Sequence, residues 1–225
     1  METARIYVGY DPREPVVYHT FCESVLNHSS IPVSFHPLSL SFLGKVTGRR
    51  DGSNDFSYSR FLVPWLNRFN GWALYADGDM VVKADIAELF AMREIDKDVL
   101  VCQHVYETKA ETKYLGNKNE SYPRKCWSAL VLWNCSNYPN RKLTPEFVAQ
   151  HDGAYLHRFS WLKDDRIGEL PVEWGWLDTE YRHNQDAKLI HYTLGAPCFK
   201  EYADCDHAPE WRQAHWMSQR PLNSR

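Results

Sequence analysis

The chain has 225 residues, of which 44% are hydrophobic and 24% charged, with a formal net charge of −3. These values are close to globular averages and exclude a largely disordered chain, and the slightly acidic balance gives no reason to expect a nucleic-acid partner. No apolar run approaches the length of a membrane span, the N-terminus lacks the features of a signal peptide, and none of the six cysteines forms a C-x-x-C pair. We therefore expect a cytoplasmic protein with one domain over residues 1–225.

The first part of the chain alternates strand and helix signals. Residues 5–10 are β-branched and aromatic and predict a strand. Asp11-Pro12 then turns the chain, and Pro15 suits the first position of a helix that runs to about Asn27. Three further elements are expected here: a strand at 33–40, a polar loop at 44–55, and a helix at 57–69 that Pro64 kinks or breaks.

The rest of the chain continues this alternation. Strands are expected at 71–76, 99–102, 128–133 and 188–192, and residues 80–82 resume the apolar pattern after Asp79. A short capped helix is expected at 85–90, a long polar loop at 105–124 and mostly helical structure at 145–161. Strands that alternate with helices indicate an α/β sheet with helices on its faces, and such sheets bind ligands beyond the carboxyl ends of their strands.

Two carboxylates follow a predicted buried strand in the segment LYADGDMVV. Asp77 and Asp79 are separated by Gly78, which lets the backbone approach a ligand. Mg²⁺ and Mn²⁺ typically take one or two carboxylates together with phosphate oxygens. Asp-Gly-Asp alone is also an ordinary turn, but apolar segments flank it on both sides, and a buried carboxylate needs a partner. The segment therefore predicts a divalent-cation site that neutralises the charge of a departing diphosphate.

Several segments resemble family 8 glycosyltransferases, and they occur in the family's order. YADGDMVVKADIAEL at 75–89 resembles the core signature of the family. Four other segments resemble it too: IYVGYD at 6–11, FSYSRFL at 56–62, LPVEW at 170–174 and HYTLGAP at 191–197. The resemblance implies the GT-A fold, a single α/β domain with a mainly parallel central sheet. About residues 1–90 would bind the nucleotide, and about residues 91–225 would bind the acceptor and complete the metal site.

The resemblance also implies a metal and diphosphate site. His191 would join Asp77 and Asp79 as the third ligand, usually of Mn²⁺, because an imidazole suits this metal beside carboxylates. Gly195 and the backbone around it would approach the diphosphate, which becomes a better leaving group there.

The nucleotide is expected at the carboxyl end of the first strand. Gly9, Tyr10 and Asp11 would surround the base and ribose, with Tyr10 stacking on the base and Asp11 accepting a hydrogen bond. The alternative is that Asp11-Pro12 is only a turn and helix cap. Arg60 matches the arginine that the family carries ahead of the acidic motif, and is our candidate for a contact with the donor; the alternative is a solvated or salt-bridged arginine.

The sequence departs from the family near the expected reaction centre. Where the family has an acidic pair, the segment YLHRFSW has none, and His157 and Arg158 occupy the approximate place. Either would then touch the donor sugar or a phosphate, with a plain surface residue as the alternative for Arg158. Asp178 is the first candidate for the general base of an inverting enzyme, with an exposed loop acid as the alternative. The lysine of the family's terminal motif is also displaced, to Lys200.

The sequence thus predicts a metal-dependent glycosyltransferase. The donor would be a nucleotide-diphosphate sugar, with UDP as the expected nucleotide, and the acceptor a carbohydrate, lipid-linked or protein hydroxyl. A catalytically impaired nucleotide-sugar binding protein is the main alternative, because the acidic pair is missing. A different metal-dependent phosphoryl enzyme is disfavoured, since the chain has neither G-x-x-x-x-G-K-[ST] nor G-x-G-x-x-G.

Overall fold

The computed structural model describes residues 3–39, 44 and 57–219. The strands are β1 Ala4–Gly9, β2 Val33–Leu38, β3 Trp72–Ala76, β4 Met80–Val82, β5 Val99–Val101, β6 Thr112–Lys113, β7 Asn117–Lys118, β8 Leu130–Asn134, β9 Ile167–Glu169, β10 Trp176–Leu177 and β11 Leu189–His191. The helices are α1 Pro15–His28, α3 Val63–Leu66, α4 Ile86–Ala91, α5 Pro145–Gln150, α6 Gly153–His157 and α7 Ala208–Ser218. Short 3-10 helices lie at Ser59–Leu62, Tyr114–Gly116, Tyr138–Lys142, Asp164–Arg166, Val172–Gly175 and Lys200–Tyr202.

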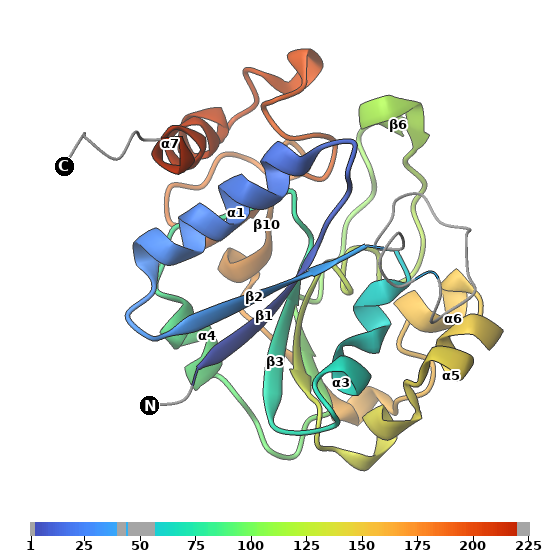
Figure 1. Cartoon of the computed structure of the whole chain (residues 1–225). Helices are drawn as coiled ribbons and strands as arrows, with labels where there is room; N and C mark the ends of the chain where they lie inside the picture. The colour runs from blue at the N-terminus through green and yellow to red at the C-terminus, as the bar shows by residue number, and fades with distance from the viewer. Residues whose placement is uncertain (1–2, 40–43, 45–56, 220–225) are drawn as a thin grey trace.

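A six-stranded sheet in the order β2-β1-β3-β8-β5-β9 forms the centre of the molecule (Figure 1). The pairs β1–β2, β1–β3 and β5–β9 are parallel, whereas β8 runs antiparallel to both of its neighbours. The predicted α/β fold with a mainly parallel central sheet is confirmed.

Helices cover both faces of this sheet, as strands that are apolar on both sides require. On one face α1 and α4 pack against β1, β3 and β8, and Phe21 and Val25 of α1 are fully buried there. On the other face the segment 59–66, α5 and α6 enclose a second core rich in aromatic residues, with Trp133 at its centre. The helices therefore cover the two faces of the sheet and leave the ends of its strands uncovered.

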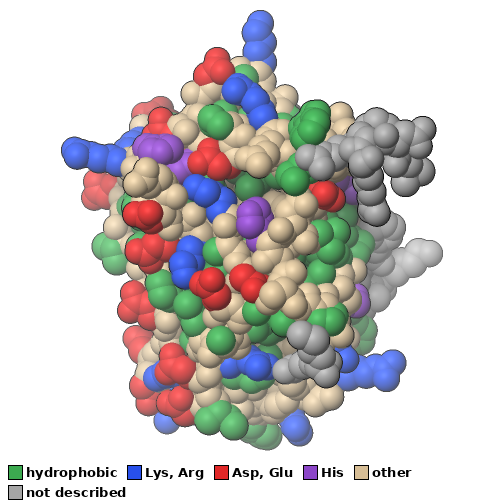
Figure 2. All heavy atoms as spheres, turned by 90° about the vertical axis from the view of Figure 1, so that its left-hand side faces the viewer, with side chains coloured by type: hydrophobic (Ala, Val, Ile, Leu, Met, Phe, Trp, Pro, Cys, Tyr) green, Lys and Arg blue, Asp and Glu red, His purple; other side chains and the backbone are tan. Residues whose placement is uncertain are grey.

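A second, three-stranded sheet lies beside the first and has the order β10-β11-β4. In it β4 runs antiparallel to β11, so that Met80 lies opposite His191. The helix α7 packs against α1 and covers this sheet with Trp211 and Ala214 (Figure 1). In Figure 2, which turns this side of the molecule to the viewer, the coloured surface intersperses acidic and basic side chains with small hydrophobic groups. The late strand predicted at 188–192 is confirmed and joined to the segment that follows Asp79.

Three predicted elements differ from the structure. The helix expected at 57–69 is a 3-10 helix at Ser59–Leu62 followed by the one-turn α3 that begins at Val63, so the predicted break near Pro64 is confirmed but the helix is shorter than expected. The loop expected at 105–124 contains the short hairpin of β6 and β7. The helical stretch at 145–161 is two helices, since the Asp152 carboxylate caps the N-terminus of α6. The loop expected at 44–55 lies, except for Gly44, outside the described residues.

No helix in the described ranges is long and apolar enough to cross a membrane. The six cysteines are all free thiols.

Candidate active site

The acidic motif connects the two sheets. Asp77, Gly78 and Asp79 lie between the end of β3 and the start of β4, as predicted. A Cβ atom on Gly78 would lie 2.5 Å from the carbonyl oxygen of Gly9, so only glycine lets this turn approach the end of β1. The Asp79 carbonyl accepts a hydrogen bond from the Tyr192 N–H at 2.9 Å, which fixes the motif against the segment after β11.

Asp77, Asp79 and His191 converge at this junction. The Nε2 atom of His191 lies 3.3 Å from Oδ1 of Asp79 and 4.0 Å from Oδ2 of Asp77. One ligand atom from each residue lies within 4.8 Å of the other two. The three side chains are only 6% to 13% exposed, so their charges are held largely out of water.

These residues fit a divalent cation. Ligand atoms bound to one ion at about 2.1 Å lie about 3.0 Å apart when adjacent and about 4.2 Å apart when opposite, and both measured distances are close to these values. The Oδ1 atom of Asp79 is buried and, apart from the 3.3 Å contact with His191, accepts no well-aligned hydrogen bond from any described residue, which leaves it able to bind a cation. Burial alone would raise the pKa of Asp79, but the His191 imidazole and the Lys113 ammonium bring that pKa below its usual value. The carboxylate is therefore ionised and ready to bind a cation.

Arg60 and Tyr75 hold the Asp77 carboxylate in place. The guanidinium of Arg60 pairs with Oδ1 of Asp77 at 2.9 Å and donates to the Ser128 carbonyl, also at 2.9 Å. The Tyr75 hydroxyl donates to the same Oδ1 at 2.6 Å. The sequence predicted a donor contact for Arg60 and no role for Tyr75. Tyr75 and Asp77 are two residues apart at a strand end and therefore share one face.

A cavity of about 200 Å³ opens above the three ligands. The motif, β11, the residues just before β8 and α6 form part of its wall, and the β6–β7 hairpin forms another part. The sequence analysis missed the hairpin, because a short polar loop carries no periodicity. Residues that line the cavity and had no predicted role include Lys113, Tyr114, Lys125, Cys126 and Ser128.

His157 lines this cavity, whereas Arg158 does not. The His157 Nδ1 atom lies 2.7 Å from the Ser128 hydroxyl, and its ring packs edge-on against Phe61. Burial, with the charges of Arg60 and Lys113, lowers the pKa of His157 to about 3. The imidazole is therefore neutral at pH 7 and offers hydrogen bonds rather than charge. The Arg158 side chain is half-buried, and its Nε forms no hydrogen bond with a described residue.

The residues expected at the nucleotide lie beside the acidic motif. Gly9 contacts Gly78, and Asp11 lines the same small recess as Asp79. The Asp11 carboxylate is buried and accepts a hydrogen bond from Nε of Arg13 at 2.9 Å. Tyr10 packs edge-on against Tyr18 with ring centroids 5.4 Å apart.

Gly195 lies in the loop after His191. A Cβ atom on Gly195 would collide with the ring of Tyr202 and would lie 3.1 Å from Cβ of Tyr114. Close packing therefore requires glycine here and holds the loop next to the hairpin.

Asp178 is buried rather than exposed in a loop. Its backbone N–H donates to the His191 carbonyl, but its carboxylate faces away and accepts a hydrogen bond from the His207 N–H at 3.0 Å. Asp178 is not among the described residues that line the cavity. The structure thus joins His157 to the three predicted ligands and leaves the Asp178 carboxylate apart from them.

Comparison with known sequences places the chain in a family. No family model matches it. It is 42% identical over 218 residues to Protein CDI of Arabidopsis thaliana, an alignment that covers 92% of this chain and 84% of that protein. The chain belongs to the family of Protein CDI. That name states no enzymatic activity.

Several glycosyltransferase structures have the same fold as this Protein CDI relative. The apo structure of the bifunctional glycosyltransferase WbbM superposes with a TM-score of 0.69 at 13% identity, over 95% of this chain and 49% of that one. GlyE of Streptococcus pneumoniae TIGR4 gives 0.63 at 12% identity, over 95% of this chain and 61% of GlyE. The galactosyltransferase LgtC, in complex with donor and acceptor sugar analogues, gives 0.57 at 13% identity, over 97% of this chain and 98% of LgtC. The chain thus spans about half the length of the WbbM chain. These likenesses show a glycosyltransferase fold of the GT-A type.

Proposed function

We propose that this protein is a metal-dependent glycosyltransferase that moves a sugar from a nucleotide-diphosphate sugar to an acceptor hydroxyl. The observation that carries this proposal is the convergence of Asp77, Asp79 and His191 beside a cavity, inside a glycosyltransferase fold. Mn²⁺ is the expected cation and UDP the expected nucleotide, as in the family 8 enzymes that its motifs resemble. The acceptor belongs to the carbohydrate, lipid-linked or protein hydroxyls.

The metal ligands are prepared for this role by their neighbours. Arg60 and Tyr75 orient the Asp77 carboxylate, so that binding a cation costs little rearrangement. When bound, the cation would neutralise charge on the departing diphosphate. Arg60 is also our candidate for a direct donor contact.

The donor is proposed to lie across the ends of β1 and β3. Gly9, Tyr10 and Asp11 would surround the base and ribose, because they line the same edge as the motif. The backbones at Gly78 and Gly195 would approach the diphosphate, since Gly78 borders the same recess as Asp79 and Gly195 follows the metal ligand His191.

His157 is the stronger of our candidates for the reaction centre. It is neutral and lies in the cavity wall, where it can hydrogen-bond a sugar hydroxyl. Arg158 remains a candidate for a phosphate contact and Asp178 for the general base. Turnover that is unchanged in Asp178→Asn would remove Asp178 from that role.

A nucleotide-sugar binding protein without turnover is the second candidate. It is favoured by one observation: of the described carboxylates that line the cavity, only the exposed Glu120 lies outside the metal cluster. The two candidates separate in a direct assay of donor hydrolysis and transfer.

The first experiment is a thermal-shift screen of nucleotide sugars with and without Mn²⁺. A ligand that binds only the folded state raises the melting temperature, by an amount that grows with its concentration over Kd. We expect a shift with UDP-sugars that needs Mn²⁺, followed by release of UDP in an assay of turnover. A Mn²⁺-dependent shift without turnover would favour the binding protein, and no shift with any donor would reject both.

A further inference from the structure

The β6–β7 hairpin is fixed to the metal-bearing part of the molecule by Tyr114. The Tyr114 N–H donates to the Leu194 carbonyl at 2.7 Å, and its ring packs on Phe199 with centroids 5.2 Å apart. The Tyr114 hydroxyl is hydrogen-bonded to Glu14 near the start of α1. The hairpin is therefore held between the loop after His191 and the start of α1, and its side chains have defined positions in the cavity wall.

Four cationic side chains among the described residues line the cavity, and three of them have a partner. Arg60 pairs with Asp77 at 2.9 Å, Lys118 with Glu120 at 3.8 Å, and the Lys125 ammonium donates to Asn119 Oδ1 at 2.6 Å. The fourth is Lys113, the last residue of β6.

Lys113 has no polar partner in the part of the chain that the structure describes. Its ammonium lies 6.0 Å from the centroid of the Tyr114 ring and forms neither a hydrogen bond nor an ion pair with a described residue. Its charge nonetheless lowers the pKa of Asp79 on one side and of His157 on the other. The ammonium thus lies within electrostatic reach of both walls, but more than the 4.0 Å of an ion pair away from the Asp79 carboxylate.

The positive charges around this gap favour a diphosphate. Asp77 and Asp79 balance a divalent cation and Glu120 balances Lys118, which leaves the positive charges of Arg60, Lys113 and Lys125, because the Asn119 partner of Lys125 is a neutral amide. A nucleotide-sugar diphosphate carries about two negative charges, and lysine binds phosphate as a point charge on a flexible stem. The diphosphate would offset two of these three positive charges, which lowers the cost of burying them.

We propose that Lys113 is a phosphate-binding residue of the donor site, which contacts the diphosphate from the side of the hairpin. This inference rests on the proposed function. It makes the hairpin part of the donor site rather than a passive wall, and it gives Lys113 the phosphate contact that the exposed Lys200 does not supply.

Calorimetry of UDP and of uridine in the presence of Mn²⁺ tests the proposal, with GDP and CDP measured in parallel. The chains are wild type, Lys113→Gln, Lys113→Arg and the matched control Lys118→Gln, which removes the same charge from the same hairpin. We expect Lys113→Gln to weaken diphosphate binding roughly tenfold or more, as for a hydrogen bond to a charged group, and to leave uridine binding unchanged. Lys113→Arg should retain most of the affinity, and Lys118→Gln should change it little.

Two results would overturn the inference while the proposed function stands: wild type binds a diphosphate but Lys113→Gln binds it equally well, or Lys118→Gln loses as much affinity as Lys113→Gln. If wild type binds none of the three diphosphates with Mn²⁺, the proposed function itself fails. Circular dichroism of each variant confirms that it is folded.

Discussion

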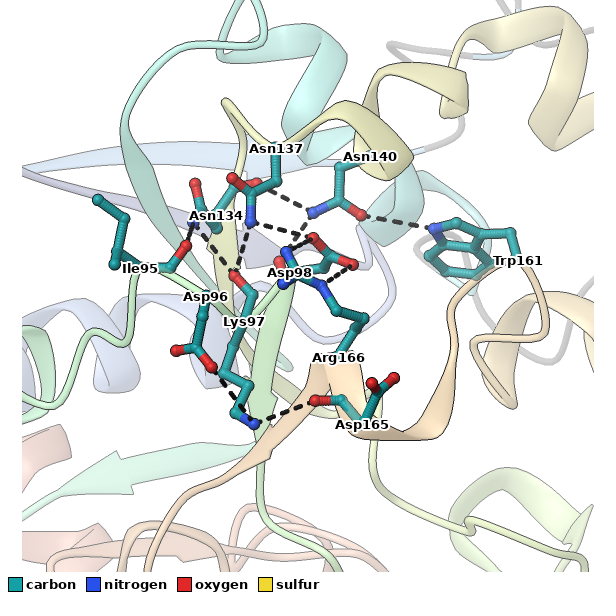
Figure 3. A network of polar contacts seen from close by, with 10 residues as sticks. All are labelled: Ile95, Asp96, Lys97, Asp98, Asn134, Asn137, Asn140, Trp161, Asp165 and Arg166. Carbon is teal, nitrogen blue, oxygen red and sulfur yellow. Dashed lines mark hydrogen bonds and ion pairs between the residues drawn. The ribbon is translucent and has the colours of Figure 1, made fainter.

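Two aspartates, Asp79 and Asp98, occupy similar positions in the fold and have opposite surroundings. Each immediately precedes a strand, β4 and β5 respectively, and each is largely or fully buried. Figure 3 shows the Asp98 carboxylate accepting hydrogen bonds from Asn137 at 3.0 Å and from two nitrogens of Arg166 at 3.0 and 3.3 Å. Asp79, in contrast, has a buried oxygen with no well-aligned hydrogen bond from the described residues.

The difference separates a structural carboxylate from a ligand-binding one. The surroundings of Asp98 are closed, because Asn134 donates to the Lys97 carbonyl and Asn140 donates to the Asp98 carbonyl (Figure 3). A buried network in which every polar atom is hydrogen-bonded contributes stability and leaves no oxygen free to bind a ligand. At Asp79, a bound cation would supply the well-aligned partner that the Oδ1 atom does not find among the described residues. The same substitution at both positions should therefore have opposite consequences.

The largest effect is expected for Asp79→Asn on turnover. The amide keeps the shape of the side chain but removes one of two negative ligands of the cation, so we expect the rate of sugar transfer to fall at least about 100-fold. The free energy of unfolding without metal should change by less than about 1 kcal/mol, because the lost attraction between Asp79 and His191 is offset by relief of the repulsion between Asp79 and Asp77. Initial rates and urea denaturation measure the two quantities. A large loss of stability with retained turnover would reverse our assignment of Asp79.

Asp98→Asn should show the reverse pattern. The new amide group places a donor against the donors of Arg166 or Asn137, so we expect the free energy of unfolding to fall by about 1–3 kcal/mol. The affinity for a nucleoside diphosphate with Mn²⁺ should not change. Urea denaturation and calorimetry on one preparation make the comparison, and unchanged stability would show that the network in Figure 3 is dispensable.

A smaller effect, on the pH dependence of stability, is expected at His104, whose buried imidazole contacts another side chain of the protein. Its Nδ1 lies 2.9 Å from the Tyr181 hydroxyl, and burial, with the nearby His191, lowers its pKa to about 3. The unfolded chain takes up this proton near pH 6.5, so the unfolded state binds more protons between pH 6.5 and 3, and stability falls as the pH falls through that window. Replacing His104 with Gln should reduce the loss between pH 7 and 5 by about 1–2 kcal/mol. Denaturation curves at both pH values check this, and equal pH slopes in the two proteins would contradict it.

The fold and the acidic half of the site were predictable because their signals are local. Asp77 and Asp79 follow a strand whose apolar run is easily recognised. Gly78 predicted a close approach of the backbone, and in the structure the backbone of Gly78 lies against that of Gly9. His191 joins them only through the pairing of β4 with β11, which no local pattern specifies. Its place came from the resemblance of the HYTLGAP segment to family 8 glycosyltransferases.

The remaining features depend on packing that a single sequence does not specify. Pro64 was expected to kink or break a helix, but its place at the start of α3 depends on how the chain turns into the second core. Lys113 lies in a short polar hairpin without periodicity, so its place in the cavity appears only in three dimensions. The Asp178 backbone N–H donates to the His191 carbonyl, yet the Asp178 carboxylate accepts a hydrogen bond from the His207 N–H.

The central claim is that Asp77, Asp79 and His191 bind a cation that in turn binds the nucleotide. Calorimetry of UDP with and without Mn²⁺, on wild type and on Asp79→Asn, tests it most directly. We predict that Mn²⁺ increases the affinity of wild type for UDP at least about tenfold, because the incomplete coordination shell needs the diphosphate oxygens, and that it has little effect in Asp79→Asn. Equal affinity in all four measurements would contradict the claim and leave Asp77-Gly78-Asp79 as a turn.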